Sequence, residues 1–226
     1  MELTPQQKRI CERVVNVFET GKPDGDYGNI SIYSDGPHDI RQITYGRSQT
    51  TEYGHLHELV EMYVNANGTL SAQLQPYLDQ IGVYALVDDA QFEKLLRDAG
   101  RNDPIMQQTQ DKFFDKAYFQ PAMDWATAHG FTQALSGLVI YDSFIHSGGI
   151  LRLLRERFPE KVPSDGGDEK EWITEYVDTR QDWLANHPRK ILRATVYRTE
   201  CFKREIARNN WDLSHLPIDA NGVKVS

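Results

Sequence analysis

Only one stretch of this chain, residues 27–45, has the residue pattern of β-strands. Its first half, Tyr27 to Ser34, is rich in β-branched and aromatic residues, and a turn follows at Asp35-Gly36-Pro37. Alternation of apolar and polar residues then resumes from Ile40 to Tyr45. Two such runs around a turn indicate a β-hairpin or a small sheet. Most of the core must therefore be built from helices.

Apolar residues recur at helical spacing on both sides of this stretch. A capping box at Thr4 to Gln7 and a stop at Gly21 predict a first helix over 5–20. The fold class expected is mainly α (α+β), in a single domain over 1–226 with its sheet near 27–46. The further helices expected begin at about 52 and lie near 70–79, 89–99, 104–128, 131–147, 149–158, 168–186 and 188–208.

Composition limits the partners and the compartment. A chain of 226 residues with 39% apolar residues can bury a core without disulfides, so Cys11 and Cys201 are expected to be buried thiols, with one bridge as the alternative. The net charge of -8 argues against a nucleic-acid partner. The sequence contains no run of 18 apolar residues, so no membrane span is predicted, and its first residues do not have the pattern of a secretory signal. The chain is expected to be cytoplasmic or to have lost a leader.

Two acidic residues flank the first half of the hairpin. Glu19 lies in the last turn of an apolar helix, where partial desolvation and the helix C-terminus both favour the protonated carboxyl. Asp35 lies at the hairpin turn, where solvent and backbone donors keep a carboxylate ionised. A glycosidase requires such a pair, one carboxyl to donate a proton and one that stays charged. A solvated helix end and a turn-forming aspartate are the alternative.

The motifs around this pair resemble glycoside hydrolase family 46, the chitosanases of the lysozyme-like superfamily. The resemblance covers about residues 10–215, and its motifs follow the family's order. They are YGNISIYSDG (27–36), ITYGRSQT (43–50), GHLHELVEMYV (54–64), LSGLVIYDSFIHSGG (135–149), YVDTRQDWL (176–184), VYRTE (196–200) and NNWDL (209–213).

The resemblance implies an endo-acting enzyme that cleaves β-1,4 linkages of chitosan by inversion. Glu19 would be the general acid and Asp35 the base that activates water, with carboxyls ~6.5–9.5 Å apart or more. Two helical lobes would flank a cleft that holds the sugar chain. The enzyme would need no cofactor or metal, act as a monomer and be secreted; a cytoplasmic location or export without a signal peptide is the alternative.

The turn departs from the family's Asp-Gly-Arg-Gly-Tyr-Thr pattern. In relatives its threonine helps to hold the water and its arginine approaches the sugar. Here these roles either move to Thr44 and Arg41 or are absent. Asp39, in the altered turn, is a rival of Asp35 as base. We favour Asp35 because its Ser-Asp-Gly context matches the family better.

Further substrate contacts also follow from the resemblance. Relatives bind a glucosamine ammonium with an aspartate near the start of the next helix. A gapless comparison puts His55 there, whereas a short insertion would put Glu52 there. Tyr27 is a candidate for stacking on a sugar ring, with a place in the core as the alternative. His146 with Gly148-Gly149 is a candidate for shaping a subsite, with a helix-ending motif as the alternative.

Asp142, Arg180 and Arg198 resemble the family's buried ionic network between the catalytic carboxyl and the core. A carboxylate flanked by two arginines tolerates burial only if all three are hydrogen-bonded. Separate surface charges are the alternative.

Motifs for other chemistries do not occur in the sequence. It lacks Cys-x-x-Cys, His-Glu-x-x-His and Gly-x-x-x-x-Gly-Lys-Ser/Thr, so the usual ligands of zinc and nucleotides are missing. Chitosan hydrolysis is the function that the resemblance implies. Two alternatives stay open: a peptidoglycan-cleaving muramidase or lysin on the same fold, and a non-catalytic sugar-binding module.

Overall fold

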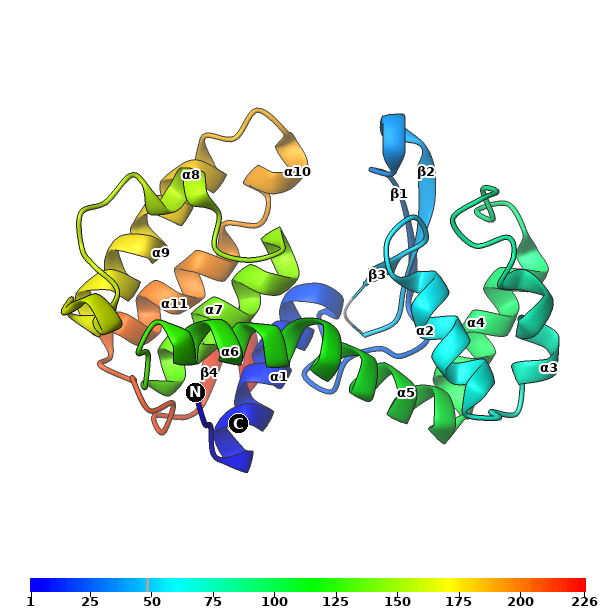
Figure 1. The fold of residues 1–226 in the computed structure, drawn as a ribbon, viewed down its shortest axis with the longest axis horizontal. Coiled ribbons are helices and arrows are strands. Elements are labelled where there is room, and N and C mark those ends of the chain that lie inside the picture. Colours follow the sequence, from blue (N-terminus) through cyan, green and yellow to red (C-terminus); the bar gives the residue numbers. More distant parts are fainter. Residues whose placement is uncertain (48) are drawn as a thin grey trace. The chain divides into compact units, whose positions relative to one another are not determined.

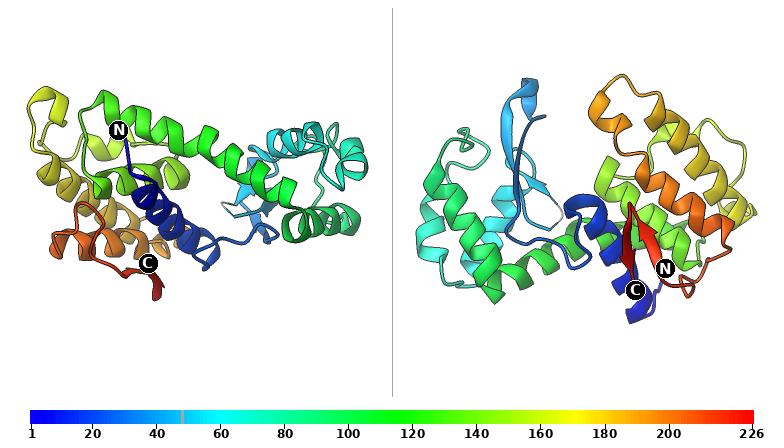
Figure 2. Two further views of the ribbon diagram at one scale, coloured as in Figure 1. Left: turned by 90° about the horizontal axis from the view of Figure 1, so that it is seen from below. Right: turned by 180° about the vertical axis from the view of Figure 1, so that it is seen from behind.

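The computed structural model describes residues 1–47 and 49–226. The chain divides into two compact units (Figures 1 and 2). One unit joins Met1–Phe18 to Ala117–Ser226, and the other is Glu19–Lys116. Each unit is described by itself below. The mainly helical fold with one small antiparallel sheet after the first helix confirms the predicted fold class.

The unit of residues 19–116 contains the predicted sheet and the helices that cover it. Its strands pair in the order β1-β2-β3, both pairs antiparallel. A short 3-10 helix, η1, closes the far end of the β1–β2 hairpin (Figure 1). The elements are β1 (Ile30–Ser34), η1 (Pro37–Asp39), β2 (Arg41–Tyr45), β3 (Thr50–Thr51), α2 (Leu56–Asn65), α3 (Ser71–Leu74), η2 (Gln75–Tyr77), α4 (Ala90–Asn102) and α5 (Pro104–Phe114).

The register of the hairpin gives the sheet one apolar and one polar face. Ile32 pairs with Ile43, and Tyr33 pairs with Gln42. Because side chains alternate along a strand, Ile43 and Tyr45 share one face, and Gln42 shares the other with Tyr33. Ile43 and Tyr45 are fully buried and join the core of this unit. Fully buried residues from its helices complete that core, among them Leu56, Leu59, Tyr63, Phe92, Leu96 and Phe113.

The other unit is helical apart from one short hairpin. Its helix α1 runs from Pro5 to Thr20, as predicted, and crosses the division between the units after Phe18. The remaining elements are η3 (Asp115–Phe119, a π-helical turn at the division), α6 (Gln120–Ala128), α7 (Ala134–Ser147), α8 (Arg152–Arg155), η4 (Pro163–Asp165), α9 (Glu169–Ala185), α10 (Lys190–Arg193), α11 (Tyr197–Ala207), β4 (Ile218–Ala220) and β5 (Val223–Val225).

Helix α7 lies at the centre of that unit. It is buried from Ala134 to Ser143 and packs against α6, α9 and α11. Its first turn is held by Glu169, whose carboxylate accepts hydrogen bonds from the backbone N–H groups of Thr132 and Gln133. Negative charge at a helix N-terminus is favourable because unpaired N–H groups point outward there. Both cysteines are free and buried in this unit, as expected.

Several boundaries differ from those predicted. The helix expected from about 52 begins at Leu56, and the one expected over 149–158 is reduced to four residues of α8. The helix expected over 89–99 continues through Gly100 to Asn102 as α4. A Cβ at Gly100 would lie 2.0 Å from the Tyr27 carbonyl oxygen, so this glycine permits close packing. The β4–β5 hairpin was not predicted. Among the described residues, no helix is both long and apolar enough to cross a membrane.

Candidate active site

Glu19 lies in the last turn of α1, half-buried, one residue before the helix ends. Gly21 follows with a φ of 73°, in the left-handed region that readily ends a helix. The preceding residue, Phe18, is held firmly: its carbonyl oxygen accepts a hydrogen bond from Tyr197 Oη at 2.9 Å. The backbone that carries Glu19 is therefore fixed at a helix end.

Asp35 follows the last residue of β1, and its side chain is exposed. Gln42 Nε2 donates a hydrogen bond to Asp35 Oδ1 at 2.8 Å. Oδ2 has no hydrogen bond within residues 1–47 and 49–226. One carboxylate oxygen is thus held, and the other is open to solvent and able to accept a proton from water.

Asp39 is in a different position in the same turn. It is exposed, has a φ of 59°, and its carboxylate has no hydrogen bond within the described residues. Of the two carboxylates, only that of Asp35 is held in a fixed orientation by a buried residue, Gln42. This geometry favours Asp35 as the base, which stays a prediction.

The hairpin does not bring Thr44 or Arg41 to Asp35. Thr44 pairs with Ser31, four residues before Asp35, or roughly 13 Å along the strand. Thr44 is also 4% exposed, so it cannot hold a water at Asp35. Arg41 points to the face opposite Gln42, and its Nη1 lies 3.4 Å from Asp88 Oδ1. The structure therefore gives no support to the role expected of Thr44 or to that of Arg41, and both stay predictions.

Glu52 was one of the two candidates for binding the amino sugar, and its surroundings in the structure do not support that role. Its side chain is 1% exposed and lies before α2, not on it. Oε2 accepts a hydrogen bond from Ile43 N at 3.0 Å, and Oε1 accepts one from Leu86 N at 2.7 Å. Both oxygens are thus used to tie β2 to the loop before α4. Glu52 is a structural residue.

Replacement of this carboxylate should therefore lower stability rather than substrate affinity. In Glu52→Gln an amide N–H₂ group would face a backbone N–H, which leaves a buried donor without an acceptor at a cost of ~1–3 kcal/mol. Urea unfolding should show this loss, while Glu58→Gln, which removes only ion pairs with the accessible side chains of Lys116 and His55, should change stability little. A fully stable Glu52→Gln enzyme with a raised KM for glucosamine hexamers would contradict the structural role.

His55 is the exposed member of the alternative pair. It is the N-cap residue of α2, and 55% of its side chain is accessible. Its Nδ1 lies 3.5 Å from Glu58 Oε2, and its ring centroid lies 5.9 Å from that of Phe113. Of the two candidates, only His55 can touch a ligand. Its contact with an amino sugar stays a prediction.

Tyr27 anchors the segment before β1 to helix α5. Its Oη donates to Asp111 Oδ1 at 3.0 Å, and its carbonyl oxygen accepts from Gln110 Nε2 at 2.8 Å. Asp111 also forms an ion pair with the buried Arg47. Burial raises the pKa of the half-buried Tyr27 hydroxyl, with a further contribution from Asp111. The structure gives Tyr27 an anchoring role, and its stacking on a sugar stays a prediction.

In the unit that contains α7, the structure brings Asp142, Arg180 and Arg198 together, all of them buried. Asp142 Oδ1 lies 2.6 Å from Arg198 Nη1, and Asp142 Oδ2 lies 2.7 Å from Arg180 Nη1. The Arg198 guanidinium lies over the Phe18 ring, 5.3 Å from its centroid. The ion pairs therefore contact the end of α1 through Phe18, the residue before Glu19.

The network also governs the protonation of its members. Burial alone would raise the pKa of Asp142, but Arg198 and Arg180 outweigh it and lower that pKa below its ordinary value. His146 lies one turn further along α7, and burial together with the two guanidinium groups lowers its pKa from 6.5 to about 3. Between pH 6.5 and about pH 3, the His146 side chain is protonated in the unfolded chain but neutral in the folded protein. The His146 contribution therefore lowers stability as pH falls from 6.5 towards 3.

Loss of the Asp142 charge should be strongly destabilising. Asp142→Asn leaves two buried guanidinium groups without a counter-ion, and breaking a buried pair in this way costs ~3–5 kcal/mol. Asp178→Asn is the control: Asp178 pairs with Lys203 at 2.6 Å on the surface, and such pairs contribute ~0–1 kcal/mol. Chemical denaturation at neutral pH compares the two variants. Similar losses in both would show that the buried pairs contribute no more than a surface pair.

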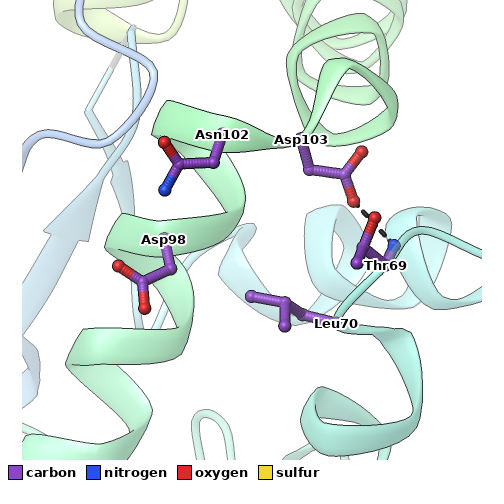
Figure 3. A pocket seen from close by; sticks show the side chains of 5 residues that line it. All are labelled: Thr69, Leu70, Asp98, Asn102 and Asp103. Carbon is purple, nitrogen blue, oxygen red and sulfur yellow. Dashed lines mark hydrogen bonds between the residues drawn. The ribbon is translucent and has the colours of Figure 1, made fainter.

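A depression of about 270 Å³ lies where α4 meets α5 (Figure 3). Its lining residues are Thr69, Leu70, Asp98, Asn102 and Asp103. The Asp103 carboxylate already accepts hydrogen bonds from Thr69 N at 2.7 Å, Tyr63 Oη at 2.6 Å and Ile105 N at 2.9 Å. The Asp103 carboxylate therefore has a structural role in this depression. Across 1–47 and 49–226, no group of three or more His, Cys, Asp or Glu is arranged to hold a metal ion.

The sequence analysis missed one residue of the site around Asp35. Gln42 is 4% exposed and holds Asp35, but a glutamine in an alternating strand carries no motif of its own. Only the register of the hairpin identifies it, because that register pairs Gln42 with Tyr33, two residues before Asp35.

Comparison with known proteins agrees with this architecture. The chain is 33% identical over 230 residues to a chitosanase of Bacillus subtilis (strain 168), an alignment that covers 94% of this chain and 81% of that protein. The native chitosanase of Bacillus subtilis MY002 matches it in structure with a TM-score of 0.85 and 26% identity over 100% of both chains.

A second structure extends this comparison to a bound oligosaccharide. It is the E19A mutant of the MY002 chitosanase complexed with 6 GlcN, with a TM-score of 0.82 and 27% identity over 95% of this chain and 94% of that one. The model of glycosyl hydrolase family 46 matches residues 13–218. The chain therefore belongs to glycosyl hydrolase family 46.

Proposed function

We propose that this protein is an endo-acting chitosanase that hydrolyses β-1,4 linkages between glucosamine units with inversion. Family membership and the names of the relatives support the substrate class. The observation that carries the mechanism is the arrangement of Asp35, with one carboxylate oxygen held by Gln42 and the other open. The relative complexed with 6 GlcN is an E19A mutant, which is consistent with a glutamate that is needed for cleavage.

In the proposed reaction, Glu19 gives its proton to the glycosidic oxygen as the bond to the anomeric carbon breaks. A water molecule attacks that carbon from the opposite face, and Asp35 takes the proton that the water loses. Glu19 ends ionised and Asp35 protonated, and exchange with solvent resets both groups. A net charge of -8 suits a polycationic substrate.

Hydrolysis of two polymers tests this function. Reducing ends should appear on chitosan and not on peptidoglycan, and the first product seen by proton NMR should be the α-anomer, as inversion requires. Cleavage of peptidoglycan alone would instead assign a muramidase. Binding of either polymer without any cleavage would assign a non-catalytic sugar-binding module.

The proposal extends to where the enzyme works and in what state. Chitosan is a large polymer, so we place its hydrolysis outside the producing cell, which fractionation of a culture tests. We also propose that the enzyme acts as a monomer, and light scattering in solution should give the mass of one chain.

A further inference from the structure

We infer that Gln42 is a positioning residue for the reaction, which orients the Asp35 carboxylate. The inference rests on the proposed role of Asp35 as base. It starts from the burial of Gln42, whose side chain is 4% exposed in a strand next to an exposed turn. A buried amide must have its hydrogen bonds satisfied, so its orientation is strongly restricted.

Two hydrogen bonds fix which end of the Gln42 amide faces Asp35. Tyr53 N donates to Gln42 Oε1 at 3.2 Å, so the amide oxygen is occupied by a backbone donor. The N–H₂ end then points the other way, where it donates to Asp35 Oδ1 at 2.8 Å. Reversal of the amide would set its oxygen against a carboxylate and its nitrogen against an N–H. The arrangement therefore admits only one orientation.

The position of Tyr53 N is itself fixed by Glu52. That buried residue is bound to β2 twice, because Glu52 N donates to the Ile43 carbonyl oxygen at 2.8 Å and Ile43 N donates back to the Glu52 carboxylate. The backbone N–H that orients Gln42 thus belongs to a rigid segment. The buried Glu52 therefore helps to orient Gln42, and through it Asp35, without touching the sugar.

Gly36 keeps room for this arrangement. A Cβ at Gly36 would lie 3.3 Å from the Tyr53 ring and 3.5 Å from the Gln42 amide carbon, besides 2.9 Å from the Ile40 carbonyl oxygen. The residue directly after Asp35 must therefore be small. No comparable set of contacts restrains the Asp39 carboxylate among the described residues.

A hydrogen bond to a carboxylate stabilises its ionised form, and this supplies a readout that a purely structural role would not move. In Gln42→Met the donor is lost at nearly constant length. The acidic limb of the pH profile of kcat/KM should move to higher pH by roughly 0.5–1 pH units. We expect kcat to fall by about 10- to 100-fold from misplacement of the base, with KM little changed because a buried residue does not touch the polymer.

Gln110→Met is the matched control. Gln110 is also a fully buried glutamine of this unit, and its amide also bridges a backbone N–H, that of Arg47, and an acceptor, the Tyr27 carbonyl oxygen. Its replacement should lower stability but leave the acidic limb in place. Equal profiles for the two variants would overturn the inference.

A second measurement does not depend on the folding of a Gln42 variant. In the wild-type protein, the side-chain amide resonances of Gln42 should titrate together with Asp35, and in Asp35→Asn they should be constant with pH. Resonances that are constant in both proteins would overturn the inference. This result is separate from the proposed function, which fails only if the wild-type enzyme does not cleave chitosan.

Discussion

Replacement of Glu19 by glutamine should reduce chitosan hydrolysis by about 10²- to 10⁴-fold, the usual contribution of a general acid. Glutamine has nearly the same shape as glutamate but no proton to transfer to the leaving oxygen. Because Glu19 is half-buried at the end of α1, we do not expect a water molecule to take over the proton donation in the variant. Release of reducing ends from glucosamine hexamers, followed at substrate saturation, measures the loss.

Glu12→Gln, on the same helix, provides the control for this experiment. It should keep nearly full activity, and both variants should unfold at about the wild-type temperature in circular dichroism. If Glu19→Gln kept more than about a tenth of wild-type turnover, a residue other than Glu19 would have to be the acid.

Asp35→Asn should cause a loss of similar size, about 10²- to 10⁴-fold in kcat. The asparagine oxygen can still accept the hydrogen bond from Gln42, so the turn keeps its geometry while the base loses its charge. Because water activation is confined to the transition state, kcat and kcat/KM should fall together. Steady-state kinetics on the hexamer separate these parameters.

Asp39→Asn tests the rival base in the same turn. Its carboxylate is exposed and is not oriented by Gln42, so its replacement should reduce kcat by less than about tenfold. The reverse order of severity would make Asp39 the base and would mean that the altered turn had been aligned wrongly with the family.

The fold was predictable to the extent that local signals determine it. The capping box at Thr4 and the glycine at 21 define α1, and the alternation on both sides of Asp35 defines the β1–β2 hairpin. The β4–β5 hairpin was missed because its strands have only three residues each, too few for a period to show. The end of α4 was predicted too early, because the close contact that explains Gly100 is with Tyr27, which is distant in sequence.

The site was predictable only for residues that a motif or a resemblance marks. Glu52 and His55 could not be separated in advance, because charge and position suit both, and only burial shows that Glu52 is occupied by two backbone donors. The distance of Thr44 from Asp35 could not be predicted, because it depends on the strand register. That register follows from a turn with positive φ at His38 and Asp39, which no local pattern specifies.

The neutral imidazole of His146 lowers the stability of the folded enzyme in acidic media. A polyamine gains charge and dissolves more readily as the medium becomes acidic, so an acidic medium offers such an enzyme more accessible substrate. Over the same interval the contribution of His146 to stability falls, because burial, together with Arg198 and Arg180, holds the pKa of its imidazole well below the ordinary value. The acid boundary of the useful working range is then a property of the scaffold around α7 as well as of the reacting carboxyls. Replacement of His146 by a residue that does not titrate would remove this contribution to the acid boundary.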